Sequence, residues 1–341
     1  MAPDSLPPRI AALPKAELHL HLEGSILPAT VCALAARHGI VVGEEEVRRR
    51  YAYKTFRDFL ETFKWVTAFL RDPQDYARIA ADLGLQLLAQ GIVYAEVTIS
   101  AGVMLWRRQT PEANFQAILR ATETFENRGL RMRWIFDAVR QFGPEQAMQV
   151  LHAAQGCASP ALVAFGIGGD ELSVPTREFR RVYQRAADLG FHRLMHAGEI
   201  GGPDKIREAV ELLGTDRIGH GLAAMHDPAL MDFLVERRIP LEMCPQSNLR
   251  TGALALQLGR SDVRMEDHPL PRLFRHGIPI VLSTDDPAMF GTTLAREYRN
   301  TLAMGLTENE LGQLVGMAFD YAFISETEKH SLQRPHRRSA S

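Results

Sequence analysis

Residues 193–220 read RLMHAGEIGGPDKIREAVELLGTDRIGH and alternate between two kinds of sequence pattern. Residues 193–197 and 217–218 are short apolar or β-branched runs, which favour β-strands. Residues 204–213, between them, place apolar side chains three and four positions apart among charges, as amphipathic helices do. This stretch therefore predicts a strand, a helix and a second strand in succession.

The same alternation extends along the whole chain of 341 residues. Eight short runs predict strands, and longer stretches with helical periodicity, such as residues 177–189, follow them. The runs cover residues 16–21, 92–99, 131–139, 161–167, 193–197, 217–218, 239–243 and 278–283. Repeated strand–helix units fit either a doubly wound parallel sheet or a closed barrel, and the number of units favours the barrel. We predict an α/β fold, a (β/α)8 TIM barrel.

The interval between residues 24 and 90 is too long for one crossover, so extra helices are expected after the first strand. Five aromatic residues cluster there, and either a lid or simple helix packing would account for them, with packing favoured for most: Phe56, Phe59, Phe63, Trp65 and Phe69. No linker or repeat divides the chain, so residues 1–327 are expected to form one domain. The polar, basic end, residues 328–341, predicts a disordered tail.

Composition limits the possible partners. The chain is 46% hydrophobic and 23% charged, with a formal net charge of -2, and its pI is near 6.6. No basic face for nucleic acid is indicated, so a small-molecule partner is expected. No membrane-spanning run and no secretion signal are visible, and the three cysteines are scattered, so the expected location is the cytoplasm. The sequence makes no prediction of the oligomeric state.

Candidate chemistry gathers at the predicted strand ends, where barrel active sites assemble. His19 and His21 lie two positions apart in a strand and therefore share one face. His196 and His220 end the fifth and sixth strands, and two adjacent carboxylates follow the eighth strand, beginning at Asp285. Three histidines with one aspartate make a set that suits zinc better than magnesium or calcium.

Six short motifs occur in a fixed order: HLHLEGS (19–25), GGDE (168–171), HAGE (196–199), GHG (219–221), CPQSN (244–248) and STDDP (283–287). In this order they resemble the adenosine deaminase family of the amidohydrolase barrels, over residues 14 to about 322. The resemblance implies hydrolytic removal of the 6-amino group of an aminopurine, with one zinc ion per chain. It also implies that the zinc ligands are His19, His21, His196 and Asp285.

Further roles follow from the same resemblance. Glu199 would donate a proton to ring nitrogen N1. His220 would orient the attacking water and either stabilise negative charge or accept the water's proton. Asp286 would hold N7, and the backbone of Gly169 would meet the N3 edge. Asp170 would either support the site or form a simple turn.

The other eight histidines are expected to be surface or packing residues: His38, His152, His192, His226, His268, His276, His330 and His336.

Two departures from the family pattern leave the substrate open. Glu23 stands where adenosine deaminases have an aspartate near the ribose 5′-hydroxyl, and Gly166 stands where they commonly have another aspartate. Three substrate types therefore compete: adenosine or deoxyadenosine, free adenine, and a nucleoside with a 5′-extension such as 6-aminodeoxyfutalosine. We favour an adenosine-like nucleoside, with Glu23 as a substrate-binding residue.

Two readings from other classes fit less well. A silent nucleoside-binding protein would be expected to lose a zinc ligand or the acid, and all of these residues are present. A two-metal hydrolase of cyclic amides or phosphoesters would need a bridging lysine or carboxylate, and no lysine stands at a predicted strand end.

Overall fold

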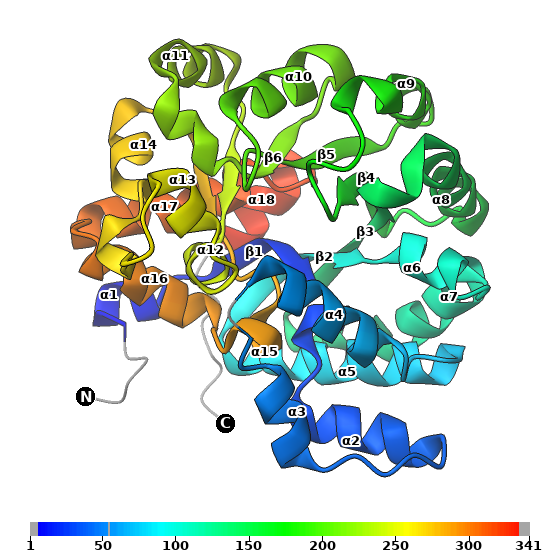
Figure 1. The fold of residues 1–341 in the computed structure, drawn as a ribbon. Helices are drawn as coiled ribbons and strands as arrows, with labels where there is room; N and C mark the ends of the chain where they lie inside the picture. The colour runs from blue at the N-terminus through cyan, green and yellow to red at the C-terminus, as the bar shows by residue number, and fades with distance from the viewer. Residues whose placement is uncertain (1–5, 54, 334–341) are drawn as a thin grey trace.

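The computed structural model describes residues 6–53 and 55–333. Eight strands form one sheet in the order β1 to β8, each parallel to its neighbours, with helices around the outside (Figure 1). The barrel closes where Leu20 of β1 bridges to Asp285, just beyond β8. The predicted (β/α)8 barrel is confirmed. The strands are β1 (Lys15–His21), β2 (Ile92–Ile99), β3 (Arg131–Val139), β4 (Leu162–Gly168), β5 (His192–Ala197), β6 (Arg217–His220), β7 (Leu241–Met243) and β8 (Ile280–Leu282).

Two strands, β7 and β8, begin two residues later than the apolar runs predict. Pro240 precedes β7 and Pro279 precedes β8, and proline has no N–H to give to a ladder. The carbonyl groups of these prolines still accept bonds from Ile218 and Leu241. The sixth strand is longer than predicted and reaches His220. Gly219 permits this, since a Cβ there would lie 2.9 Å from Cε1 of His19.

The predicted insertion after the first strand contains four helices, α2 (Pro28–Arg37), α3 (Glu44–Arg50), α4 (Phe56–Thr67) and α5 (Pro73–Ala89). Thr55 caps the start of helix α4, because its side chain accepts a hydrogen bond from the backbone N–H of Asp58. It is strongly amphipathic, with Phe59 and Val66 buried on one face. This face places α4 over the carboxyl ends of the strands.

The remaining helices connect or flank the strands. They are α1 (Pro8–Ala11), α6 (Ala101–Trp106), α7 (Pro111–Thr122), α8 (Gly143–Cys157), α9 (Arg180–Asp188), α10 (Pro203–Leu213), α11 (Pro228–Arg237), α12 (Pro245–Arg250), α13 (Ala253–Leu258), α14 (Leu270–His276), α15 (Pro287–Phe290), α16 (Leu294–Ala303), α17 (Glu308–Asp320) and α18 (Glu326–Gln333). Within the described part of the chain, none is long and apolar enough to cross a bilayer.

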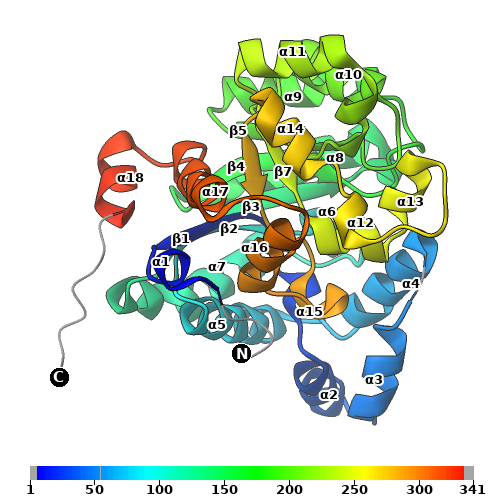
Figure 2. The ribbon, with the colours of Figure 1, turned by 90° about the vertical axis from the view of Figure 1, so that its left-hand side faces the viewer.

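The disordered tail was expected to begin at residue 328, and this is wrong for its first six residues, 328–333. Helix α18 covers Glu326–Gln333 and lies on the side of the molecule away from α4 and α13 (Figure 2). The Ser325 hydroxyl donates to Glu328 at 2.7 Å, and the Glu328 N–H donates to the Ser325 hydroxyl at 3.3 Å. Glu328 also pairs with Arg131. Capping and this ion pair stabilise the helix, and Leu332 packs against the core cluster that contains Phe319 and Ala322. Residues 334–341 of the expected tail lie outside the described residues.

Candidate active site

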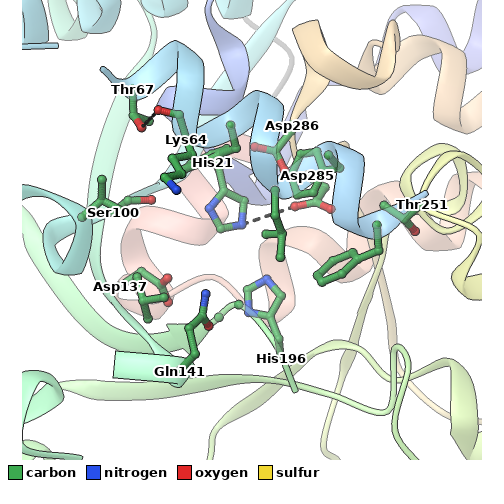
Figure 3. Close-up of a pocket in the computed structure, with 18 of the residues that line it drawn as sticks. His21, Lys64, Thr67, Ser100, Asp137, Gln141, His196, Thr251, Asp285 and Asp286 are labelled. Atoms are coloured by element: carbon green, nitrogen blue, oxygen red, sulfur yellow. Dashed lines mark hydrogen bonds and ion pairs between the residues drawn. The ribbon is translucent and has the colours of Figure 1, made fainter. Parts of the chain in front are cut away.

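The carboxyl ends of the strands open into a cavity of about 340 Å³. Its inner part, which we call the cavity floor, is polar and consists of His21, His196, Glu199, His220, Asp285 and Asp286. Its outer part, the cavity wall, is mainly apolar and comes from α4, α6 and the end of β3: Phe56, Phe59, Leu60, Phe63, Val103, Trp106, Val139 and Phe142. Figure 3 shows floor residues Asp285 and Asp286 across the cavity from Asp137 and Gln141.

His19 and His21 alternate along β1 with Leu18 and Leu20, which places both imidazoles on the inner face. Nδ1 of His19 lies 2.7 Å from a carboxylate oxygen of Glu242 on β7. This contact fixes the ring proton on Nδ1 and leaves Nε2 with its lone pair. Among the described residues, that buried Nε2 has no hydrogen-bond partner.

Asp285 meets this pair from the end of β8. Its backbone is left-handed, with φ of 66°, and two backbone bonds hold it to β1. The His21 N–H donates to its carbonyl at 2.8 Å, and its own N–H donates to the carbonyl of His19 at 3.0 Å. The side-chain Oδ1 lies 3.3 Å from Nε2 of His21 and 3.6 Å from Nε2 of His19. Such a backbone, unusual outside glycine, is characteristic of functional sites.

The four predicted ligands are brought together with His220. Ring centroids of His196 and His19 are 4.7 Å apart, and those of His196 and His21 are 5.5 Å apart. Two groups of candidate ligand atoms share Asp285: one contains His19, His196 and His220, and the other contains His21 and Asp286. The unpartnered Nε2 of His19 and this nitrogen-rich donor set fit a zinc ion.

Glu199 lies on the loop after β5, and Glu171 holds that loop. The Glu171 carboxylate accepts four backbone N–H groups, those of residues 198, 199, 200 and 201, at 2.5–3.1 Å. Burial raises the pKa of Glu199 well above its usual range, and the charges of Asp285 and Glu171 add to the rise. This shift favours the neutral, proton-carrying form of the Glu199 carboxyl group. The role of Glu171 was not predicted, although the residue stands in the GGDE motif.

Gly169 and Asp286, which were predicted to hold the purine ring, both line the cavity. Gly169 lines the cavity with φ of +97°, and a Cβ there would lie 2.5 Å from a side-chain oxygen of Gln141. Asp286 also lines it, with a buried Oδ1 that has no hydrogen-bond partner among the described residues. Burial, followed by the charge of Asp285, raises the pKa of Asp286 well above its usual range. Both residues therefore lie where a bound ring could contact them, and the raised pKa favours the neutral form of Asp286.

Glu23 and Asp170 are not among the described residues that line the cavity. Glu23 is buried and accepts the N–H of Ser100 at 3.1 Å. Asp170 accepts the N–H of Leu172 at 3.1 Å and the hydroxyl of Ser173 at 2.7 Å. Asp170 therefore forms a turn.

Three further polar residues were not predicted. Asp137, on β3, lines the cavity beside Gly166, where a Cβ would lie 3.2 Å from Asp137 Oδ1. A carboxylate from the neighbouring strand thus lies next to the position where the family commonly has an aspartate. Asn248 lies behind His220, and His268, which was expected to be a surface or packing residue, is buried and contacts Asn248. His336 lies outside the described residues.

The aromatic cluster of the insertion divides into two groups. Phe56, Phe59 and Phe63 line the cavity, so they do more than the helix packing expected for most of the cluster. Trp65 instead packs edge-on against Phe69, with ring centroids 5.0 Å apart.

Known proteins are similar to this chain over most of its length. The family described as Adenosine deaminase matches residues 14–335. An aminodeoxyfutalosine deaminase of Acidothermus cellulolyticus is 37% identical, with 88% of this chain and 85% of that protein covered. An adenosine deaminase of Yersinia pseudotuberculosis is 34% identical, with 94% and 96% covered.

Solved structures agree with the sequence relatives. The crystal structure of an adenine deaminase from Arthrobacter aurescens has a TM-score of 0.88 and 30% identity, with 94% of this chain and 97% of that chain covered. An amidohydrolase from Burkholderia ambifaria with bound Zn has a TM-score of 0.85 and 25% identity, with 94% and 89% covered. The extent of these matches shows that this chain belongs to the adenosine deaminase family of aminohydrolases.

Proposed function

We propose that this chain removes the 6-amino group of an adenosine-like purine nucleoside as ammonia, using one zinc ion held by His19, His21, His196 and Asp285. The observation that carries the proposal is the buried cluster of these residues in the same cavity as Glu199, whose pKa burial raises. The chemistry that zinc supplies when bound is the activation of water near neutral pH.

The floor residues account for the remaining steps. Glu199 delivers its proton to ring nitrogen N1, which makes C6 electrophilic enough for water to add. Asp286 donates to N7 and the backbone N–H of Gly169 donates to N3, so the ring is held by its edge. Addition of water at C6 and departure of ammonia leave the 6-oxopurine.

The cavity wall supports a nucleoside rather than free adenine as the substrate. A flat base held by the floor leaves the apolar space along α4 and α6 for a substituent on N9. Glu23 does not line this space itself, but its carboxylate accepts the backbone N–H of Ser100, which does, so Glu23 supports the sugar side through Ser100. Trp106 stacks on Phe142 with ring centroids 6.0 Å apart, which favours a second candidate, an aminopurine nucleoside with an extended 5′-substituent. The partner in either case is a small molecule, with no nucleic acid or membrane involved.

All three cysteines, Cys32, Cys157 and Cys244, are unpaired. Free thiols are typical of a reducing compartment, which supports the cytoplasm as the place of the reaction.

The experiment is ammonia release from adenosine, deoxyadenosine, adenine and 6-aminodeoxyfutalosine, measured in parallel with metal-analysed protein. Glu199→Gln should reduce the rate by roughly 10²–10⁴ because the amide has no proton to deliver. Exposed Glu178→Gln is the matched control and should leave the rate unchanged. Activity on adenine alone would contradict the nucleoside, and a normal rate for Glu199→Gln would contradict the acid.

A further inference from the structure

His220 is connected to a row of buried hydrogen bonds behind the cavity floor. Its Nδ1 lies 3.1 Å from Nδ2 of Asn248, and Oδ1 of Asn248 lies 3.2 Å from Nε2 of His268. Nδ1 of His268 in turn accepts the backbone N–H of Leu270 at 3.2 Å. His220, Asn248 and His268 are 1%, 0% and 3% exposed, so water does not compete for these contacts.

The backbone of Leu270 determines the direction of every bond in the row. An N–H group can only donate, so Nδ1 of His268 carries a lone pair and the ring proton is on Nε2. This proton requires the oxygen of Asn248 opposite it, which turns the amide N–H group toward His220. Nδ1 of His220 must then accept, and its ring proton is on Nε2.

Any other placement of these protons would set two hydrogen-bond donors opposite each other. Rotating the Asn248 amide would set its N–H against the Nε2–H of His268. Protonating His268 would set an Nδ1–H against the N–H of Leu270, and burial, followed by the charge of His220, lowers the pKa of His268 to about 3. A buried unmatched polar group costs more than one hydrogen bond.

We propose that Asn248 and His268 are positioning residues that hold His220 in its Nε2–H tautomer, so that His220 presents a hydrogen-bond donor to the reaction centre. His220 Nε2 lies 3.6 Å from Oε2 of Glu199 and 3.9 Å from Oδ2 of Asp285. A neutral imidazole nitrogen that carries the proton has no lone pair for a metal ion. His19 has the opposite tautomer, because Glu242 holds its Nδ1–H.

The resemblance leaves two roles open for His220, stabilising negative charge or accepting the proton of the attacking water. The Nε2–H tautomer allows only the first. This consequence for catalysis rests on the proposed function. A neutral Nε2–H donor orients the oxygen that attacks C6 and stabilises negative charge on it. It cannot accept a proton at that nitrogen.

The first test is ¹⁵N NMR of the histidine side chains in the zinc-loaded protein, with assignments from single histidine substitutions. We expect Nε2–H spectra for His220 and His268 and an Nδ1–H spectrum for His19. An Nδ1–H spectrum for His220 would overturn the proposal. This spectrum reports the tautomer whether or not any aminopurine is deaminated, so failure of the proposed function would be seen separately.

The second test is Asn248→Asp, which replaces the donor beside His220 with an oxygen that only accepts. The proton should move to Nδ1 of His220, and kcat should fall by about 10–100-fold with KM little changed, as for other residues that orient an active-site histidine. Asn114→Asp is the matched control, because Asn114 is also buried and its amide donates to Gln109. It should leave the His220 spectrum and kcat unchanged.

If Asn248→Asp behaved like Asn114→Asp in both spectrum and kcat, neither residue would position His220. Should Asn248→Asp fail to fold, His268→Phe provides the same test. That variant frees the Asn248 amide to rotate, so both tautomers of His220 should appear, and a pure Nε2–H spectrum would contradict the role of His268.

Discussion

The cavity floor and the cavity wall are built in different ways. Floor residues are held by directional bonds to a second polar residue, as Ser247 donates to Asp285 at 2.6 Å and Glu171 binds the loop of Glu199. Wall residues are held by ring contacts, such as Phe59 against Phe290 with centroids 5.2 Å apart. Directional bonds fix atoms closely, whereas apolar contacts tolerate changes of shape. The floor should therefore determine the reaction and the wall should determine the substrate.

The largest effect is expected where the floor binds the metal ion. Asp285→Ala removes a candidate ligand and the partner of two histidines, so zinc content should fall well below one ion per chain. Turnover should fall to the level of chelator-treated protein. Metal analysis together with ammonia release checks both. A fully zinc-loaded variant would assign the ligand to Asp286 or another group.

A second floor prediction concerns the loop that carries Glu199. Glu171→Gln replaces one of the oxygens that accept four N–H groups, so the loop should shift and kcat should fall by about 100-fold, the cost of a displacement near 1 Å. Asp170→Asn, in the adjacent turn, is the control. Equal kcat values for the two variants, measured at saturating substrate, would show that the loop is held in another way.

Much of the floor could be predicted from the sequence, because strand ends converge at one end of a barrel. His21, His196, His220 and Asp285 lie at or just beyond the ends of strands, and the structure brings them together with His19.

The supporting residues were not predictable in this way. His19 and Glu242 are 223 positions apart, and no local pattern connects them. His268 and Asn248, likewise, become partners only when β8 and its preceding helix close the barrel.

The sequence predicts the helical insertion that contributes to the wall, but it does not predict that this insertion lines the cavity. Helical spacing places Phe59 and Phe63 on one face of α4 and does not say what that face meets. Trp65 and Phe69 belong to the same aromatic cluster and pack against each other. Which aromatic residues reach the substrate depends on how α4 lies over the strand ends, which is a tertiary property.

Trp106→Ala tests the wall. Loss of this ring should raise KM for a nucleoside by about 10-fold, the equivalent of one aromatic contact, with kcat unchanged. Trp65→Ala is the matched control, because Trp65 packs on Phe69 rather than lining the cavity. Steady-state kinetics on nucleoside and free base distinguish the two variants. A fall in kcat for Trp106→Ala would mean that the wall also shapes the reaction.

The last prediction concerns stability rather than activity, and it follows from the burial of a carboxyl group beneath the floor. Glu297 accepts the N–H of Gln246 at 3.3 Å, at the start of the helix that carries Ser247 and Asn248. Burial raises the pKa of Glu297 from 4.5 to about 7. The folded state therefore binds a proton more tightly than the unfolded state, so stability falls as pH rises from about 4.5 to about 7.

This difference corresponds to about 3 kcal/mol, and Glu297→Gln should remove it. The measurement is the free energy of unfolding by denaturant for the zinc-loaded proteins between pH 5 and 8. The change of this free energy with pH reports the effect, because hydrogen bonds lost in the variant lower its stability equally at every pH. The wild type should lose stability relative to Glu297→Gln as pH rises, while Trp106→Ala should follow the wild type. If the stability of the wild type and of Glu297→Gln changed with pH in parallel, ionisation of Glu297 would cost no stability. The Glu297 contact beneath the floor would then be as insensitive to pH as the wall.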